Sequence, residues 1–323
     1  MIKEAVKWAG KKLLGDNVLF KETAYTYKAK GRYFTAAAFT LCTAPFRKAV
    51  DYRRVLKQYE FITSEDYYRE LHGLLRIDAA EGFGLVRIGR DNDGGYIMLD
   101  DLPGGVAYSF GIAGDVSWDK DMASRGYDVF MYDHTIDGLP EENPRFHWHK
   151  LGISDGLTQD DRLKSLEELI TANGHEGQRN MILKMDVEGA EWGFLERVRP
   201  ETLAQFGQIV FEFHSMTNPD NTERILNALR KINATHQLIH LHANNNSTYI
   251  TSGGKNFASV LEASYVLRDK YRFSASYDLT LPLEIDSPNA PGYPEIPLGH
   301  WNSQPEFDGK FTLSCIEEKI LRQ

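Results

Sequence analysis

Three carboxylates follow directly on an apolar segment near the middle of the chain. Residues 181–185 read Met-Ile-Leu-Lys-Met, and Asp186, Glu188 and Glu191 come next. A short apolar run bounded by turn residues is typical of a buried strand in a parallel sheet, whose ligands bind at the carboxyl ends of the strands. Burying carboxylates costs free energy, so their placement here indicates a polar ligand, a metal ion or proton transfer.

The next two apolar segments also end in polar residues. Glu212 and His214 alternate with phenylalanines and therefore share one face of an expected strand, while His242 and Asn244 end the following one. An imidazole titrates near neutrality, so His214 is the first candidate for a general base, with Asp186 and His242 as further catalytic candidates. A structural role for each histidine is the alternative.

The same residues form an alternative donor set for a metal ion. The set comprises Asp186, Glu188, Glu212, His214, His242 and Asn244. Carboxylate, imidazole and amide groups together suit Mg²⁺ or Mn²⁺. No two-residue ligand spacing on a helix accompanies them, so we assign no residue as a metal ligand and keep a divalent cation as an alternative cofactor.

A loop of small residues supplies the candidate cofactor site. Residues 110–115, Phe-Gly-Ile-Ala-Gly-Asp, lie between an expected strand and an expected helix. Small residues let the backbone approach a ligand, and the helix behind them supplies amide donors. The predicted contacts are Gly111, Ala113, Gly114 and Asp115. The third glycine of a dinucleotide loop is absent, and Val116 and Ser117 leave less room for a pyrophosphate.

Asp133 ends the next expected strand, roughly 20 residues after the loop begins. A carboxylate there can accept hydrogen bonds from both ribose hydroxyls of an adenosine, which suits S-adenosylmethionine (SAM) or a nicotinamide dinucleotide. A loop or helix-capping aspartate is the alternative. Lys184, inside the expected strand at 181–187, should face the interior, either in an ion pair with Asp133 or Glu191 or in a catalytic role.

Strands and helices alternate from residue 107 onward, which predicts a doubly wound α/β fold with a mostly parallel sheet. The expected strands are 107–112, 128–132, 145–153, 181–187, 208–213, 237–242 and 260–267. The expected helices are 117–125, 161–172, 190–198 and 222–232. No helix separates the last two strands, so they should pair antiparallel. Segments 85–88 and 96–99 flank an Asn-Asp-Gly-Gly turn and predict a hairpin.

Three regions are expected along the chain. Residues 1–75 form an N-terminal helical cap, with Ser64 as a helix start. Residues 76–285 form the Rossmann-like domain. Residues 286–323 are Pro-rich, which excludes regular helix and central strand, so they either wrap over the body or form a plain tail.

Several motifs resemble one enzyme family. Residues 183–191, containing Asp-Val-Glu-Gly-Ala-Glu, resemble a strand end of the FkbM-type methyltransferases. Arg87-Ile88-Gly89 and Asp93-Gly94-Gly95-Tyr96, together with His240-Leu241-His242-Ala243-Asn244-Asn245 and Leu261-Glu262-Ala263-Ser264-Tyr265, resemble a methyltransferase-like subgroup of that family. The resemblance covers roughly residues 85–297. It implies a Rossmann-like class I SAM methyltransferase fold with an antiparallel last strand.

The resemblance also implies an activity. Such enzymes transfer a methyl group from SAM, usually to a hydroxyl oxygen, and the implied acceptors are sugars, glycans or secondary metabolites. Ser154 and Asp155 fall where these enzymes hold the adenine amino group, although Asp155-Gly156 is also an ordinary turn. Asp186 is expected to touch the cofactor as well. The candidate substrate contacts are Tyr96, Arg87, Glu188, Glu212 and Asn244.

The bulk properties limit partners and location. A net charge of −9 over 323 residues argues against a broad nucleic-acid or anionic-membrane footprint, while the basic N-terminal segment leaves a peripheral membrane contact open. Two cysteines, Cys42 and Cys315, give no disulfide framework, and no signal peptide or bilayer-length apolar stretch is found, so we expect a cytoplasmic protein. The rival functions are a nicotinamide-dependent oxidoreductase and a non-catalytic partner subunit.

Overall fold

The computed structural model describes residues 19–29, 32–42, 61–275 and 279–314, and the chain divides into two compact units, Met1–Tyr59 and Glu60–Gln323. In the first unit, β1 (Leu19–Ala29) and β2 (Arg32–Cys42) pair antiparallel. The predicted helical cap over residues 1–75 is therefore wrong for both segments. Both are rich in threonine, tyrosine and phenylalanine, which favour strands. The remaining predicted cap at 1–18 and 43–60 lies outside the described residues.

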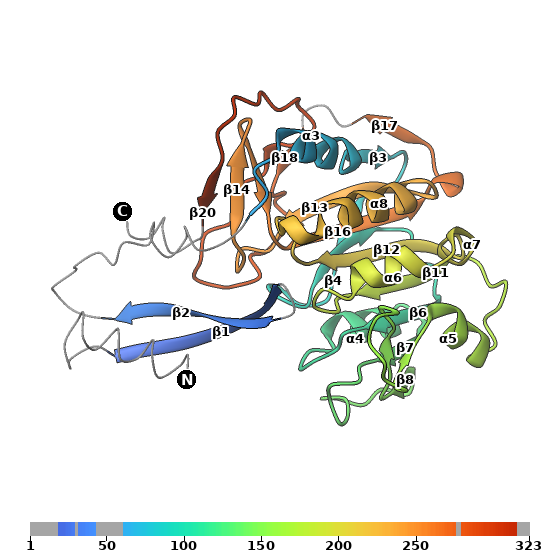
Figure 1. Cartoon of the computed structure of the whole chain (residues 1–323). Coiled ribbons are helices and arrows are strands. Elements are labelled where there is room, and N and C mark those ends of the chain that lie inside the picture. Colours follow the sequence, from blue (N-terminus) through green and yellow to red (C-terminus); the bar gives the residue numbers. More distant parts are fainter. Residues whose placement is uncertain (1–18, 30–31, 43–60, 276–278, 315–323) are drawn as a thin grey trace. The chain divides into compact units, whose positions relative to one another are not determined.

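The second unit is built on a seven-stranded sheet with the order β13-β16-β12-β11-β6-β7-β8 (Figure 1). Its strands are β6 (Gly105–Phe110), β7 (Tyr127–Tyr132), β8 (Phe146–His149), β11 (Met181–Met185), β12 (Phe206–Phe213), β13 (His236–Ala243) and β16 (Leu261–Leu267). Six strands are parallel, and β16 is antiparallel to both β12 and β13. The prediction of a mostly parallel sheet with an antiparallel last strand is confirmed, and the mixed α/β architecture is compatible with a Rossmann-like fold.

Helices and short strands complete the unit. The helices are α3 (Glu65–Leu74), α4 (Ser117–Ser124), α5 (Leu166–Ala172), α6 (Glu191–Arg197), α7 (Pro200–Leu203) and α8 (Thr222–Asn233), with 3₁₀ turns η1 (Pro219–Asn221) and η2 (Arg268–Lys270). Ser64 accepts a hydrogen bond from the Tyr67 amide, as expected of a helix start. The predicted helix at 161–172 begins only at Leu166, because Ser165 and Glu168 form a capping box. The predicted strand at 145–153 divides into β8 and β9 (Gly152–Ile153), which pairs with β10 (Leu163–Lys164).

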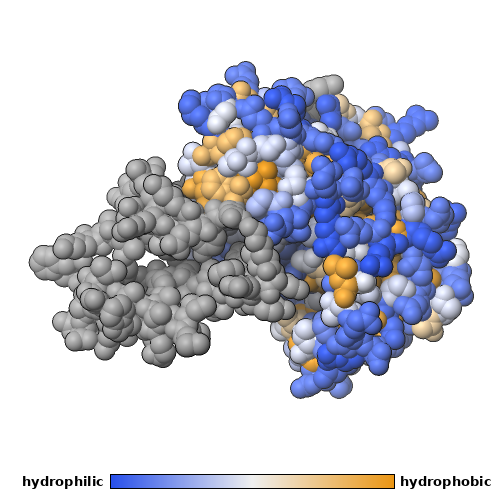
Figure 2. Space-filling view, viewed as in Figure 1, coloured by the Kyte–Doolittle hydropathy of each residue, from blue (hydrophilic) through white to orange (hydrophobic). Residues whose placement is uncertain are grey.

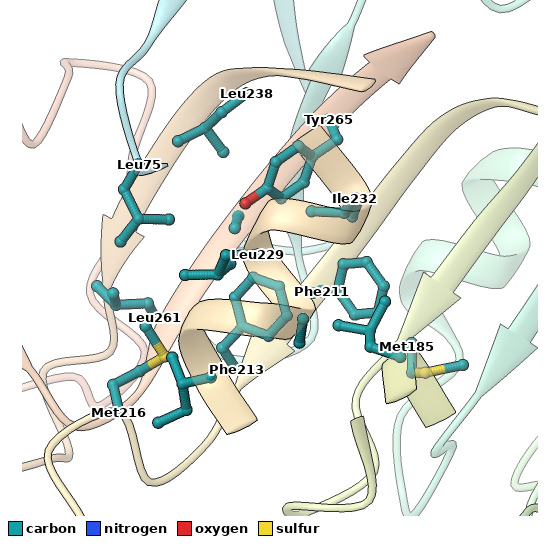
Figure 3. Packing of buried hydrophobic residues seen from close by; sticks show 14 of the residues in the cluster. Leu75, Met185, Phe211, Phe213, Met216, Leu229, Ile232, Leu238, Leu261 and Tyr265 are labelled. Carbon is teal, nitrogen blue, oxygen red and sulfur yellow. The ribbon is translucent and has the colours of Figure 1, made fainter. Parts of the chain in front are cut away.

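Side chains alternate along each strand of the sheet and pack into two apolar layers, one on each face. Leu183 of β11 joins the larger layer, which includes residues of α3, α5, α6 and α8, whereas its neighbour Ile182 joins a smaller layer with α4 and the hairpin β4 (Leu85–Ile88) and β5 (Tyr96–Leu99). Figure 3 shows the larger layer, where Phe211 and Phe213 of β12 pack near Leu229 of α8. The sheet is thus covered on both faces, and the predicted β4–β5 hairpin is confirmed.

The remaining short strands of this unit form three small sheets. They are β3 (Asp78–Ala80) with β17 (Phe273–Ala275), β18 (Thr280–Leu281) with β19 (Gly299–His300), and β14 (Tyr249–Ser252) with β15 (Lys255–Ala258) and β20 (Thr312–Ser314). The Pro-rich segment from Asp286 onward contacts the body. Trp301 is fully buried, and its indole Nε1–H donates to the Leu75 carbonyl over 2.8 Å.

Among the described residues, no helix is both long enough and apolar enough to cross a bilayer. The face of the second unit drawn in Figure 2 is mostly hydrophilic, with apolar residues in small groups.

Candidate functional site

The carboxyl ends of β6 and β11 meet where the strand order reverses. From β6 the chain builds the sheet outward through β7 and β8, and then returns to place β11 on the other side of β6. Ligands of open α/β sheets bind at such a switch point. The Asp186 amide donates to the Phe110 carbonyl over 3.1 Å, and a Cβ on Gly111 would lie 1.6 Å from the Asp186 carbonyl oxygen. Only glycine therefore fits at position 111, whose φ is +75°.

Asp186, Glu212 and His214 converge beside this junction, and we name them the acid–histidine cluster. One oxygen or nitrogen atom from each residue lies within 4.8 Å of the others. His214 Nε2 is 3.3 Å from Glu212 Oε2 and 3.5 Å from Glu188 Oε2. On its other side, His214 Nδ1 lies 2.5 Å from Oε1 of the fully buried Glu191. The structure thus brings together four residues that the sequence predicted for the site, with Glu191 behind them.

The carboxylates beside His214 favour its protonated form and so disfavour its predicted role as a neutral general base. Burial disfavours the charged ring, but hydrogen bonds to Glu191 and Glu212 and their negative charges outweigh it and raise the pKa of His214 to about 12. A ring that is protonated at neutral pH cannot accept another proton. Burial, and then the neighbouring charge of Glu212, raise the pKa of Asp186 to about 7.

His242 lies outside the cluster and is also unsuited to be a base. Its Nδ1 is 3.1 Å from Glu262 Oε2, and its Nε2 is 3.1 Å from Glu295 Oε2. Burial opposes protonation, but the charge and hydrogen bond of Glu262 and the hydrogen bond of Glu295 raise the pKa of His242 to about 10. The Asn289 side chain donates to Glu262 Oε1. Glu262, Glu295 and Asn289 were not among the predicted site residues. Glu262 belongs to β16, whereas Glu295 and Asn289 belong to the Pro-rich segment, for which a wrap over the body was one of two expectations.

Three of the predicted substrate contacts border the cluster. The Tyr96 hydroxyl donates to Asp186 Oδ2 over 3.0 Å, and the Asn244 amide donates to Glu212 Oε1 over 2.7 Å. Glu188 has a positive φ of 52° and a largely exposed side chain. Arg87 is elsewhere: its guanidinium donates to the carbonyls of residues 90, 92 and 95 and so holds the β4–β5 turn, which argues against a substrate contact.

Lys184 stabilises the junction between the ends of β6 and β11. Its ammonium donates to the Gly111 carbonyl over 2.9 Å and lies 5.4 Å from the centre of the Tyr96 ring. Neither of its predicted ion-pair partners, Asp133 and Glu191, is found within salt-bridge distance of it in the described part of the chain. The nearby buried acid is Asp119 of α4, whose pKa is raised by burial and partly restored by the charge of Lys184. The sequence around Asp119 carried no signal for this placement.

Asp133 stabilises the predicted cofactor loop through hydrogen bonds. Its Oδ2 accepts hydrogen bonds from the Ile112 and Ala113 amides, both at 3.0 Å. Its Oδ1 accepts from the Thr135 amide at 2.8 Å and from the Thr135 hydroxyl at 2.6 Å. These four contacts fill the acceptor positions of a carboxylate. Burial opposes ionisation, but the hydrogen bonds lower the pKa of Asp133, so the group is charged at neutral pH.

The other predicted cofactor residues serve mainly local structure. Asp115 accepts from the Ser117 amide and hydroxyl at the start of α4 and pairs with Arg90 over 3.0 Å. Gly114 is open, because a Cβ there would meet no atom within 4 Å. An open pocket beside the loop is lined by Gly114, Asp115, Ser117 and Lys120, among others.

Ser154 and Asp155 form a turn. The Ser154 hydroxyl accepts from the amide of residue 156, and Asp155 Oδ1 accepts from the amides of Leu157 and Thr158. A second open pocket is lined by Ser154 and the start of α5. Neither of the two pockets is lined by the acid–histidine cluster. The adenine contact of Ser154 and Asp155 stays a prediction.

Comparisons with known proteins do not assign this chain to a family. No family model matches the chain, and no curated protein matches it. A solved structure titled "Putative hemolysin from Streptococcus thermophilus" is 13% identical, covers 74% of this chain and 77% of its own, and has a TM-score of 0.28. At that TM-score the likeness carries no argument about fold or function.

Proposed function

We propose that this protein is a SAM-dependent O-methyltransferase that acts on a hydroxyl group of a sugar, a glycan or a secondary metabolite. The observation that carries the proposal is the junction of Gly111 and Asp186 at the switch point of the sheet, beside a cluster of carboxylates. The antiparallel β16 agrees with the last strand that the resembled methyltransferases have. The acceptor class comes from the resemblance alone.

Binding of SAM at the proposed site would require one exchange of hydrogen-bond partners. Asp133 Oδ1 is bonded to Thr135, which is exposed, so a ribose hydroxyl could replace the Thr135 hydroxyl at little cost. Gly114 leaves open space on the loop. The nearby acids favour a cation, and the sulfonium of SAM carries a positive charge.

The group that removes the proton from the acceptor hydroxyl should be a carboxylate in this site. His214 and His242 are both protonated at neutral pH, whereas the pKa of Asp186 is about 7. General bases work best with a pKa near the working pH. Asp186 is accordingly the proposed base, Tyr96 orients it through its hydrogen bond, and Glu188 is placed to meet the acceptor.

A calorimetric titration tests the cofactor assignment. We expect SAM and its demethylated product to bind with micromolar dissociation constants. Asp133→Asn should weaken both by at least tenfold, because an amide offers one acceptor oxygen in place of two. The matched control is Asp137→Asn, which removes an exposed carboxylate of the same loop that pairs with Lys150. Thr135→Val should leave binding intact, because the ribose displaces that hydroxyl.

Two outcomes would overturn the assignment. Absence of SAM binding by folded protein would remove the methyltransferase proposal, and binding of NADH by the same protein would favour the oxidoreductase. Equal losses in the Asp133→Asn and Asp137→Asn variants would remove Asp133 from the cofactor site.

A further inference from the structure

We infer that the acid–histidine cluster binds a divalent cation, with Mn²⁺ as the ion that its donors suit best. The three residues offer two carboxylate oxygens and one imidazole nitrogen that converge within 4.8 Å. Carboxylates suit Mg²⁺ and Mn²⁺, and adding an imidazole favours Mn²⁺ over the harder Mg²⁺ and Ca²⁺. The donors come from two neighbouring strand ends, since Asp186 follows β11 while Glu212 and His214 belong to the end of β12.

Each donor residue is held from behind by a group outside the cluster. Tyr96 donates to Asp186 Oδ2, and Asn244 donates to Glu212 Oε1. Glu191 lies against His214 Nδ1, which leaves Nε2 turned toward Glu212 Oε2. The cation would bind Nε2 in place of its proton, which is released to solvent. Metal-binding histidines commonly donate their other N–H to a carboxylate, and ligating carboxylates are themselves hydrogen-bonded, because these contacts fix the ligand orientation. All three donors of the acid–histidine cluster are thus oriented by neighbouring groups, as metal ligands are.

Glu191 supplies a second observation. Its side chain is fully buried, and Oε2 has no hydrogen-bond partner among the described residues. A buried carboxylate oxygen without a partner is costly. The acids within hydrogen-bond or ion-pair reach of His214 are Glu188, Glu191 and Glu212, and Asp186 is a fourth nearby. Two cations, His214 and Lys184, stand against these four acids. A bound divalent cation would offset the excess negative charge.

The catalytic role of the cation rests on the proposed function, whereas the cation site itself does not. A bound cation would hold the acceptor hydroxyl and acidify it, as Lewis-acidic metals do for bound oxygen ligands. Asp186 would then be a ligand, and the exposed carboxylate of Glu188 would take up the acceptor proton in its place. Binding of the cation itself requires neither SAM nor an acceptor.

Electron paramagnetic resonance measures this binding with Mn²⁺ alone, because the signal of free aqueous Mn²⁺ falls as the ion binds. The full-length wild-type chain should bind one Mn²⁺ saturably. Glu212→Gln should weaken binding at least tenfold, and Tyr96→Phe should weaken it by about 10-fold or more, in the range seen for residues behind metal ligands. Glu295→Gln is the matched control, because it removes a carboxylate beside His242, outside the cluster.

The outcomes separate the two proposals. No saturable Mn²⁺ binding by the wild type, or equal binding by Glu212→Gln and Glu295→Gln, would overturn the cation site. A Tyr96→Phe variant that melts like the wild type and binds Mn²⁺ less tightly would support the site independently of any folding defect in Glu212→Gln. Mn²⁺ binding without SAM binding would keep the site and remove the methyltransferase proposal, and SAM binding without Mn²⁺ binding would do the reverse.

Discussion

The partners of each buried histidine decide whether it is charged. Carboxylates surround His214 and His242, and both rings hold a proton well above neutrality. His236, by contrast, is fully buried with its Nε2 2.9 Å from the Phe206 carbonyl and its Nδ1 2.8 Å from the Thr235 hydroxyl. A carbonyl can only accept, so Nε2 carries the hydrogen and Nδ1 accepts from the hydroxyl. Burial lowers the pKa of His236 to about 4, against the partly opposing carbonyl contact.

The lowered pKa of His236 predicts that the folded protein loses stability in acid. Its pKa falls from an ordinary 6.5 to about 4 on folding, so its contribution is present above pH 6.5 and is lost as the pH falls toward 4. The shift corresponds to about 3 kcal/mol between pH 7 and pH 4. Urea unfolding at both pH values should show that His236→Gln loses less stability on acidification than the wild type. His300→Gln, a change at an exposed histidine, should follow the wild type. Parallel losses in all three proteins would refute the assignment.

Alternation along the strands correctly predicted that Glu212 and His214 share a face, but it could not predict a charge state. The pKa of His214 depends on Glu191, 23 residues earlier, and that of His242 depends on Glu295, 53 residues later. Burial and contact between segments so far apart are properties of the folded chain. The choice of His214 as base could not take these contacts into account, nor could the sequence show that Asp133 already accepts hydrogen bonds from Thr135 and the loop amides.

At the level of elements, the contact between the ends of β6 and β11 is the tightest constraint on the site. Gly111→Ala would place a Cβ 1.6 Å from the Asp186 carbonyl oxygen at a φ of +75°, so we expect a destabilisation of about 3 kcal/mol or more. Gly114→Ala, three residues along the same loop, meets no atom within 4 Å and should change stability by less than about 1 kcal/mol. Urea unfolding of both variants measures the difference. Similar midpoints for the two would mean that the strand ends do not touch as described.

The long elements with strong periodicity were predicted well, and the short or polar ones were not. The apolar run at 181–185 could only be a buried strand between two turns, and it is β11. The segment between β13 and β16 contains no helix, as expected, but its hairpin of β14 and β15 was not predicted. Residues 19–42 were assigned to helix by extension from their neighbours, against the strand preference of their own threonines and aromatics.

The second unit has the core of an independent domain. The three apolar clusters found among the described residues draw their members from Phe61 to Leu313. The C-terminal segment belongs to that core, because Trp301 is buried and His72 Nε2 lies 2.6 Å from the Trp301 carbonyl oxygen. The predicted boundary at residue 75 would cut through this packing, since α3 supplies Tyr68 and Leu71 to the largest cluster. The boundary between the two units falls at residues 59 and 60 instead.

We therefore expect a chain of residues 60–323 to fold without the first unit. Because α3 and the C-terminal segment both belong to the largest apolar cluster, this chain should unfold in one cooperative transition. Its melting temperature should lie within about 5 °C of the full chain, which corresponds to a free-energy change of roughly 1–2 kcal/mol for a domain of this size. A chain of residues 76–323 is the matched comparison, and it should melt far lower or fail to fold, because it lacks the helix that carries Tyr68 and Leu71. Differential scanning calorimetry of the three chains decides between the two boundaries: if the 60–323 and 76–323 chains melt alike, α3 is not part of the cooperative core.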